Sequence, residues 1–212
     1  MRNTNIIMLA STNHGKITEF ASLFKAYPHL QLKGVEELVF NIRSLRGAEN
    51  GNNYYENAYN KGRLAHLAAK YPTLSDDSGL EVDALDGKPG FHSDRYATPK
   101  SSETKDQANV RKLLEELKGV PKEKRTARFV CTLVFFVEGV VLTTTETMEG
   151  TILEAPRGEN GFGYDPVFLV KGTDKSLAEM DTEEKNKISH RSKALKNMLT
   201  LIQEKEVKLV RP

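Results

Sequence analysis

Two adjacent aspartates in the middle of the chain are the residues best suited to do chemistry. Asp76 and Asp77 stand in the run Ser75-Asp76-Asp77-Ser78-Gly79, directly after a short strand that we predict at 73–75. Neighbouring side chains at a strand end point in different directions, so one carboxylate can face a metal ion while the other faces water. Mg²⁺ is usually held by one or two carboxylates together with substrate phosphates, which suits this pair. An Asp-rich turn would have the same composition, because Asp, Ser and Gly are common in turns.

A candidate phosphate site lies near the start of the chain, in the run Ser11-Thr12-Asn13-His14-Gly15-Lys16. We predict a buried strand over 5–10, a polar loop over 11–15 and then a helix. Backbone N–H groups at a helix start, a glycine that allows close approach and a lysine together suit a bound phosphate. The glycine and lysine spacing of a Walker A loop is absent. A polar helix cap beside a surface lysine would give the same run of residues.

Two segments toward the C-terminus combine glycines, aromatic residues and cations. In Gly161-Phe162-Gly163-Tyr164-Asp165-Pro166, two glycines around an aromatic residue indicate a backbone that lies close to a flat group such as a base. A structural turn with a core Phe would have the same pattern. Lys185 precedes Ser189-His190-Arg191, where we expect a helix to begin. Cations at a helix start oppose the macrodipole, which indicates an anionic or acceptor-rich ligand, with a solvated basic face as the alternative.

Further charged and metal-ligating residues are spread along the chain. Glu49 and Glu56 are acidic candidates on either side of the loop at 50–53, and Lys61 follows in the next expected helix. The remaining histidines show no metal-ligand spacing with one another or with Cys131, so the sequence argues against zinc. The Cys131 thiol lies in an apolar run with no activating neighbour, which predicts a buried and inert cysteine.

Apolar residues at helical spacing predict the helices that position these groups. Ser189 can cap the last of them, since Ser is a common N-cap residue. The predicted helices are one that follows the loop at 11–15 and ends before Pro28, one over 54–70, two with apolar stripes at 110–117 and 195–202, and a short one whose start at Asp181 and Glu184 has capping-box spacing.

Strands alternate with these helices. Besides the two strands already named, the runs 128–137 and 140–147 flank Glu138-Gly139, a strong two-residue hairpin signal. Loops are expected at 43–53 and 158–166. Alternating helices and strands plus a hairpin predict an α/β domain with a mixed sheet.

Composition restricts the class of protein. The 212 residues suffice for a single domain over 1–212, in two closely packed lobes with no separable linker. The 31 basic and 29 acidic residues leave a net charge of +2, which argues against a dedicated nucleic-acid or membrane binder. One cysteine excludes an internal disulfide, and the short apolar segment near the N-terminus does not have the form of a signal peptide. We therefore expect a cytoplasmic protein.

Together these segments resemble the inosine triphosphate pyrophosphatase family, also called XTP/dITP diphosphatases, and the resemblance runs nearly end to end. Two departures are Ser11-Thr12 in place of a more usual Thr-Gly, and Asp94 where the family commonly has Ala, which leaves the role of Arg95 open. The matching runs are Ala10-Ser11-Thr12-Asn13 with Lys16, Tyr55-Glu56-Asn57-Ala58 with Lys61, Asp76 to Leu85, Gly87-Lys88-Pro89-Gly90, Ala127-Arg128-Phe129, Gly161 to Pro166, and Glu184-Lys185 with Ser189-His190-Arg191.

This resemblance implies a fold and a set of residue roles. The implied fold is an elongated mixed β-sheet flanked by helices in two lobes, with the nucleotide in the cleft, usually as a homodimer. Asp77 would be the general base, Ser78 would contact the substrate, and Glu49 with Asp76 or Asp77 would bind Mg²⁺. The other implied substrate-binding residues are Ser11, Thr12, Asn13, His14, Gly15 and Lys16 at the triphosphate, Lys61, and Phe162, Gly163, Tyr164, Asp165, Lys185, His190 and Arg191 around the base and sugar.

The activity that the resemblance implies is hydrolysis of ITP, dITP and XTP to the monophosphate and pyrophosphate. We expect a water molecule, activated by Asp77 and polarised by Mg²⁺, to attack the α-phosphorus. Donors from Arg191 or His190 would select purines with an O6 acceptor, while the feature that rejects GTP is not evident in the sequence. Two alternatives are a Maf-like septum-inhibitor pyrophosphatase that prefers other bases and a non-catalytic nucleotide-binding module.

Overall fold

The computed structural model describes residues 5–39 and 50–209, and the chain falls into two compact units. Unit 1 comprises Met1–Asp77, Cys131–Glu146 and Arg191–Pro212, and unit 2 comprises Ser78–Val130 and Thr147–His190. Most of the loop predicted at 43–53 lies outside the described residues. The prediction of a single domain stays a prediction.

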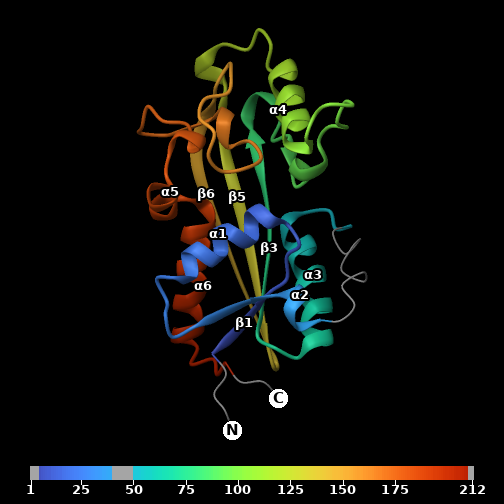
Figure 1. Ribbon diagram of the computed structural model, residues 1–212, viewed down its shortest axis with the longest axis vertical. Helices are drawn as coiled ribbons and strands as arrows, with labels where there is room; N and C mark the ends of the chain where they lie inside the picture. The colour runs from blue at the N-terminus through green and yellow to red at the C-terminus, as the bar shows by residue number, and fades with distance from the viewer. Residues whose placement is uncertain (1–4, 40–49, 210–212) are drawn as a thin grey trace. The chain divides into compact units, whose positions relative to one another are not determined.

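Helices and strands alternate along most of the chain (Figure 1). The helices are α1 (His14–Phe24), α2 (Val35–Leu38), α3 (Tyr54–Ala69), α4 (Lys105–Glu116), α5 (Thr182–Ile188) and α6 (His190–Glu204). The strands are β1 (Ile6–Leu9), β2 (Gln31–Gly34), β3 (Thr73–Val82), β4 (Pro89–Gly90), β5 (Thr126–Val137), β6 (Val140–Ile152) and β7 (Phe168–Val170). Within the described ranges, no helix has the length and apolar composition that crossing a membrane requires.

The strands form one seven-stranded sheet in the order β2-β1-β3-β5-β6-β7, with β4 paired to β3. β1 runs parallel to β2 and β3, whereas β4 is antiparallel to β3 and β7 is antiparallel to β6. Three strands, β3, β5 and β6, contribute residues to both units. The predicted α/β class with a mixed sheet flanked by helices is therefore confirmed.

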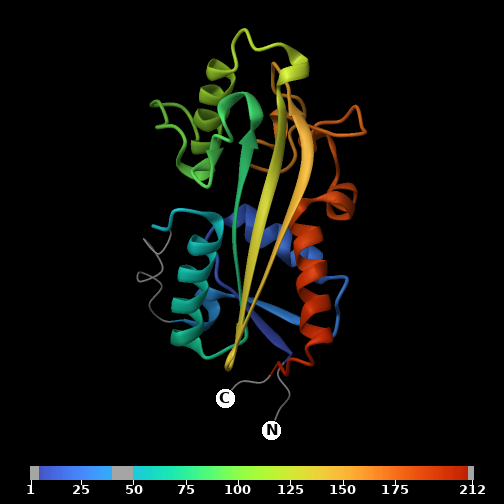
Figure 2. The ribbon, with the colours of Figure 1, turned by 180° about the vertical axis from the view of Figure 1, so that it is seen from behind.

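Helices cover both faces of the strands in unit 1, and Figure 2 shows α3 and α6 on opposite sides of them. Leu9 of β1 and Phe135 of β5 pack with residues of α1 and α6. Their neighbours Met8 and Val134 belong to clusters formed with α2 and α3. Because successive strand residues point to opposite faces, a strand that is covered on both sides must be apolar throughout. This explains why the run at 129–137 is apolar except for Thr132.

The core of unit 2 forms between α4 and the strands of that unit. Val110, Leu113 and Leu117 pack with Leu80 of β3 and Phe168 of β7. The amphipathic helix predicted from this stripe is thus confirmed. Its start is held by a capping box between Thr104 and Gln107.

Strand β3 differs from its prediction. The sequence predicts a strand that ends at Ser75, whereas β3 continues through the acidic pair to Val82. Asp and Gly are poor strand formers, but strand pairing overrides this preference, as at Leu80 opposite Gly90 of β4. The acidic pair therefore lies inside a strand, and not after one.

Other boundaries agree more closely. Helix α1 begins at His14, inside the loop predicted at 11–15, because Asn13 already acts as its N-cap. β2 and α2 lie in a segment for which the sequence predicts no element. The predicted hairpin turn is confirmed, with Gly139 at φ 72°.

Candidate active site

The carboxyl end of β1 lies beside the part of β3 that carries Asp76 and Asp77, so segment 11–16 and the acidic pair meet in unit 1. Met8 of β1 lies opposite Thr73 of β3, and the Ala10 N–H donates to the carbonyl of Leu74 at 2.8 Å. Segment 11–16 therefore leaves β1 beside the part of β3 that carries the acidic pair. Ligands of parallel α/β sheets bind at this edge, so the two segments meet where such a site is expected.

Segment 11–16 forms the N-terminus of α1. Asn13 is the N-cap, and its side-chain oxygen accepts a hydrogen bond from the Lys16 N–H at 3.1 Å. The buried Ser11 hydroxyl accepts from the Asn13 N–H at 3.3 Å. The first turn of α1, which the structure describes in full, contains no acidic residue that would compete with an anion for the positive end of the helix dipole. This arrangement fits the phosphate site expected from the sequence.

Asp76 lies at the centre of three cations. Its side chain is fully buried, and its Oδ2 is 2.8 Å from the Nζ of Lys16 and 3.8 Å from the Nε of Arg191. Lys61 donates from Nζ to the backbone carbonyl of Asp76 at 2.7 Å. These cations come from α1, α6 and α3. One aspartate thus gathers three residues that the sequence assigns to the substrate.

These charges determine the ionisation of Asp76 and Lys16. Burial by itself raises the pKa of Asp76, but the charges of Lys16, Lys61 and Arg191 outweigh burial and hold that pKa well below its usual range. Burial by itself lowers the pKa of Lys16, but the Asp76 carboxylate reverses this effect and the pKa is raised. Both groups are therefore charged near neutral pH and form a buried ion pair.

Asp77 faces different partners. Its Oδ2 accepts a hydrogen bond from the Nδ2 of Asn57 at 2.9 Å, and the residue is 7% exposed. Two residues earlier along β3, the Ser75 hydroxyl donates to the carbonyl of Ala58 at 2.7 Å. The alternation along the strand separates the two carboxylates, because Asp76 meets cations while Asp77 meets the amide of an α3 residue. The pair can therefore perform two different tasks.

A second buried ion pair anchors Arg191. Its Nη1 lies 3.0 Å from the Oε2 of Glu19 in α1, and the two side chains are 6% and 7% exposed. These partners are 172 residues apart in the chain. The sequence interpretation missed Glu19, because one acidic residue in an amphipathic helix carries no signal of its partner.

In unit 2, residues 161–165 form a closed turn. The Phe162 N–H donates to the Oδ2 of Asp165 at 3.0 Å, and the Asp165 N–H donates to the carbonyl of Phe162 at 3.2 Å. Gly161 and Gly163 have φ values of 79° and 62°, in the left-handed region that favours glycine. A Cβ on Gly161 would also lie 2.0 Å from the Oδ2 of Asp165. The turn therefore requires glycine at position 161 for two reasons.

Asp165 also holds Lys185. The Lys185 Nζ is 2.7 Å from the Asp165 Oδ2 and 5.1 Å from the centre of the Phe162 ring, within cation–π range. Lys185 lies in α5, where the capping box predicted for Asp181 and Glu184 is confirmed. The turn and α5 thus bring together three of the residues predicted to surround the base.

Tyr164 and His190 are packed within unit 2. The Tyr164 hydroxyl donates to the carbonyl of Ser93 at 2.9 Å, and burial raises the pKa of this tyrosine. The His190 ring stacks on Phe129 with centroids 4.9 Å apart, and His190 is 1% exposed. These contacts give both side chains a packing role, while their contact with substrate stays a prediction.

The remaining predicted residues are less constrained. Thr12 and His14 are exposed, and Ser78 of unit 2 is half-buried. Glu49, a predicted metal ligand, lies outside the described residues. In the part of the chain that the structure describes, no group of three or more His, Cys, Asp or Glu side chains has the arrangement of a metal site. The Mg²⁺ ligand set stays a prediction.

Comparison with known proteins identifies the family. The model of the Ham1 family matches residues 7–201. The dITP/XTP pyrophosphatase of Geobacillus kaustophilus is 47% identical over 89% of this chain and 90% of its own length, and that of Bacillus subtilis is 43% identical over 92% and 96%. The solved structure of the Staphylococcus aureus Ham1 protein is similar with a TM-score of 0.76 and 39% identity, covering 95% of this chain and 99% of that one. In agreement with the resemblance of its motifs, the chain belongs to the Ham1 family.

Proposed function

We propose that this chain hydrolyses non-standard purine nucleoside triphosphates, such as ITP, dITP and XTP, to the monophosphate and pyrophosphate, and so removes them from the nucleotide pool. The observation that carries the proposal is the cluster in unit 1, where three cations converge on Asp76 beside Asp77. Such cations suit a triphosphate, and the neighbouring carboxylate supplies a base. The names of relatives at 43–47% identity support the substrate class.

Asp77 is the proposed general base. An ionised carboxylate can take a proton from the water that attacks the α-phosphorus. The hydrogen bond from Asn57 to the Asp77 Oδ2 holds this carboxylate in one orientation. A preoriented group needs little reorganisation as the reaction proceeds, which favours catalysis.

Mg²⁺ is the proposed cofactor. The donors that Mg²⁺ prefers are carboxylate oxygens together with substrate phosphates, and Asp76, Asp77 and Glu49 offer such oxygens. We assign Glu49 with Asp76 or Asp77 as the ligands, and Asp76 also positions the cations, because its Oδ2 accepts from Lys16. When bound, Mg²⁺ would polarise the phosphoryl oxygens and neutralise part of their charge.

The triphosphate is assigned to the N-terminus of α1, with Lys16 and Lys61. Helix N–H groups and lysines bind phosphate oxygens, and they also stabilise the charge that builds up on the pyrophosphate as it leaves. The burial of Lys16, with a side chain 11% exposed, strengthens this interaction because less water competes for the charge.

The base and sugar are assigned to Phe162, Gly163, Tyr164, Asp165, Lys185, His190 and Arg191. The half-buried Phe162 ring offers a flat surface for stacking, and Lys185 beneath it is a candidate donor. Hypoxanthine and xanthine present an O6 acceptor where adenine presents an N6 donor. Donors from Arg191 or His190 would therefore favour the keto bases.

A homodimer in the cytoplasm, without nucleic acid or membrane as a partner, completes the proposal and rests on the resemblance and on the balanced charge. Light scattering coupled to size-exclusion chromatography measures the mass directly. A monomer across the working concentration range would overturn the dimer without affecting the proposed reaction.

A nucleotide panel tests the proposed reaction. The chain is incubated with Mg²⁺ and each of ITP, XTP, dITP, GTP, ATP and the pyrimidine triphosphates, while pyrophosphate and orthophosphate are measured in parallel. Pyrophosphate release with ITP, dITP and XTP as the preferred substrates is the expected result. Orthophosphate as the first product would overturn the cleavage site, and preference for another base would favour the Maf-like alternative. No turnover with any nucleotide would favour a binding module.

A further inference from the structure

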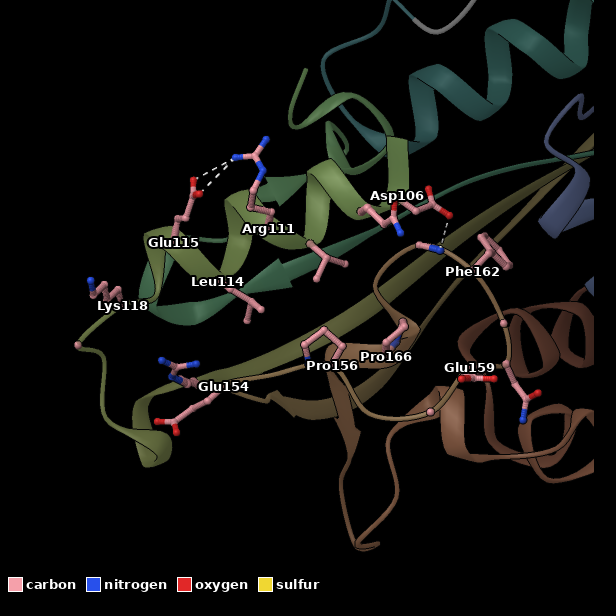
Figure 3. A pocket seen from close by; sticks show the side chains of 18 residues that line it. Asp106, Arg111, Leu114, Glu115, Lys118, Glu154, Pro156, Glu159, Phe162 and Pro166 are labelled. Carbon is pink, nitrogen blue, oxygen red and sulfur yellow. Dashed lines mark hydrogen bonds and ion pairs between the residues drawn. The ribbon is translucent and has the colours of Figure 1, made fainter. Parts of the chain in front are cut away.

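Asp106 of α4, which belongs to none of the sequence motifs described above, contacts the 161–165 turn. Its Oδ2 accepts a hydrogen bond from the Gly163 N–H at 2.8 Å (Figure 3). Gly163 stands at the tip of the turn, next to Phe162, and 57 residues from Asp106 in the chain. A hydrogen bond to a charged acceptor is stronger than one between neutral groups. This contact therefore ties the turn directly to a helix of the unit 2 core.

The hydrogen bond between Asp106 and Gly163 matters because the turn borders a cavity. A hollow of about 920 Å³ opens between α4 and the segment 154–166, and Asp106, Phe162 and Gly163 are among the residues that line it. Figure 3 shows Phe162 and Asp106 at one end of this cavity and Glu115 toward the other. Residues that line a cavity lack packed neighbours on that side, so dispersion contacts there do not hold the turn in place.

The other contacts close the turn internally, reach Ser93 at its base, or involve Lys185 of α5, whose Nζ is 2.7 Å from the Asp165 Oδ2 and 5.1 Å from the centre of the Phe162 ring. The hydrogen bonds between Phe162 and Asp165 close the turn, and the Tyr164 hydroxyl reaches the Ser93 carbonyl at its base. These contacts preserve the shape of the turn, but its tip can still tilt toward the cavity. The Asp106 bond holds the backbone of Gly163 at the tip itself, and so opposes such a tilt from the side of α4.

We infer that Asp106 is a positioning residue that sets where the Phe162 ring stands for the base of the bound nucleotide. The inference rests on the proposed function, because it gives the turn a substrate to meet. Loss of this positioning should affect binding of the base and not the catalytic groups. A misplaced Phe162 weakens nucleotide binding, whereas Asp77 and the cations of unit 1 are left unchanged. Loss of the Asp106 carboxylate should therefore raise KM much more than it lowers kcat.

Three variants separate this role from a general effect on α4. Asp106→Ala removes the acceptor, while Asp106→Asn keeps an acceptor oxygen and removes only the charge. Glu115→Ala is the matched control, because Glu115 lies on the same helix and lines the same cavity but bonds to Arg111. The capping box of Thr104 and Gln107 holds the start of α4 in all three. Any effect of charge on the helix dipole would appear equally in the Asn and Ala variants.

Steady-state kinetics with ITP and Mg²⁺ and amide hydrogen exchange of the peptide covering 161–166 are measured on each full-length variant. Asp106→Ala should raise KM about tenfold with kcat changed less than about threefold, and should speed exchange in this peptide. Asp106→Asn should largely restore both, and Glu115→Ala should match the unmodified chain. Equal behaviour of Asp106→Ala and Glu115→Ala would overturn the inference. If the unmodified chain hydrolysed no nucleotide but Asp106→Ala still sped amide exchange at 161–166, the contact between Asp106 and the turn would stand and the proposed function would be rejected.

Discussion

Removal of each of the two adjacent carboxylates of β3 should affect a different property of the protein. Asp76 balances buried cations, since its Oδ2 is 2.8 Å from Lys16 and 3.8 Å from Arg191. Asp77 accepts from a neutral amide, that of Asn57. A buried ion pair that loses one partner leaves an uncompensated charge, whereas a hydrogen bond to an amide can be replaced by another neutral acceptor. Loss of the Asp76 carboxylate should therefore lower stability, and loss of the Asp77 carboxylate should lower turnover.

Turnover should depend on Asp77. The variant Asp77→Asn removes the proposed base and should lower kcat for ITP by about 10²–10⁴-fold, the usual contribution of a positioned general base. Its free energy of unfolding should change by less than about 1 kcal/mol, because the Asn carbonyl can still accept from Asn57. Pyrophosphate release and urea denaturation measure the two quantities. Near-normal turnover would contradict the assigned role.

Stability should depend on Asp76. The variant Asp76→Asn leaves Lys16 and Arg191 with a buried excess of positive charge, so the free energy of unfolding should fall by about 3–5 kcal/mol. Urea denaturation followed by circular dichroism measures this loss, and Asp77→Asn, one residue away in the same strand, is the control. If the two variants unfolded at the same urea concentration, Asp76 would not be the centre of the cluster.

Elements whose apolar residues recur at helical spacing could be predicted from the sequence. Boundaries that depend on strand pairing or on helix capping could not. α3, α4 and the turn at Glu138-Gly139 match their predictions, because spacing and turn chemistry act locally. The length of β3 depends on neighbouring strands, and no local pattern in Asp76 to Gly79 shows them. The burial of Cys131 was predictable for the same reason as the helices, since it lies in an apolar run.

Helix α3 can approach the sheet closely because of Gly62. A Cβ at this position would lie 2.2 Å from the Ser75 Oγ and 2.6 Å from a ring carbon of Phe136. Helix propensity alone predicts that Gly62→Ala gains about 1 kcal/mol. The overpacking should outweigh this gain and lower the free energy of unfolding by about 1–3 kcal/mol. Urea denaturation of Gly62→Ala, with the exposed neighbour Arg63→Ala as the control, shows whether helix propensity or overpacking dominates. A stabilised Gly62→Ala would mean that α3 can shift away from the sheet.

For the whole molecule, the sequence indicates the candidate segments but not the contacts between them. Segment 11–16 meets the acidic pair because β1 is parallel to β3 and ends beside residues 73 and 74, just before Asp76. The pairing of Glu19 with Arg191 and of Asp106 with Gly163 spans 172 and 57 residues, and each depends on how helices pack. Such contacts carry no periodic or motif signal. They are set by tertiary packing alone.

Charge balance within the cluster around Asp76 predicts that the fold does not need the metal. Lys16, Lys61 and Arg191 match Glu19, Asp76 and Asp77 in number, and ion pairs and hydrogen bonds join all of them except Asp77, which accepts from Asn57. A neutral cluster requires no cation to relieve repulsion between its carboxylates. Removal of Mg²⁺ with EDTA should therefore abolish pyrophosphate release, shift Tm by less than about 2 °C, and be reversed by added Mg²⁺. Calcium-saturated EDTA controls for the chelator itself. A large fall in Tm would mean that the metal holds the acidic pair together, contrary to the role assigned to Lys16 and Arg191.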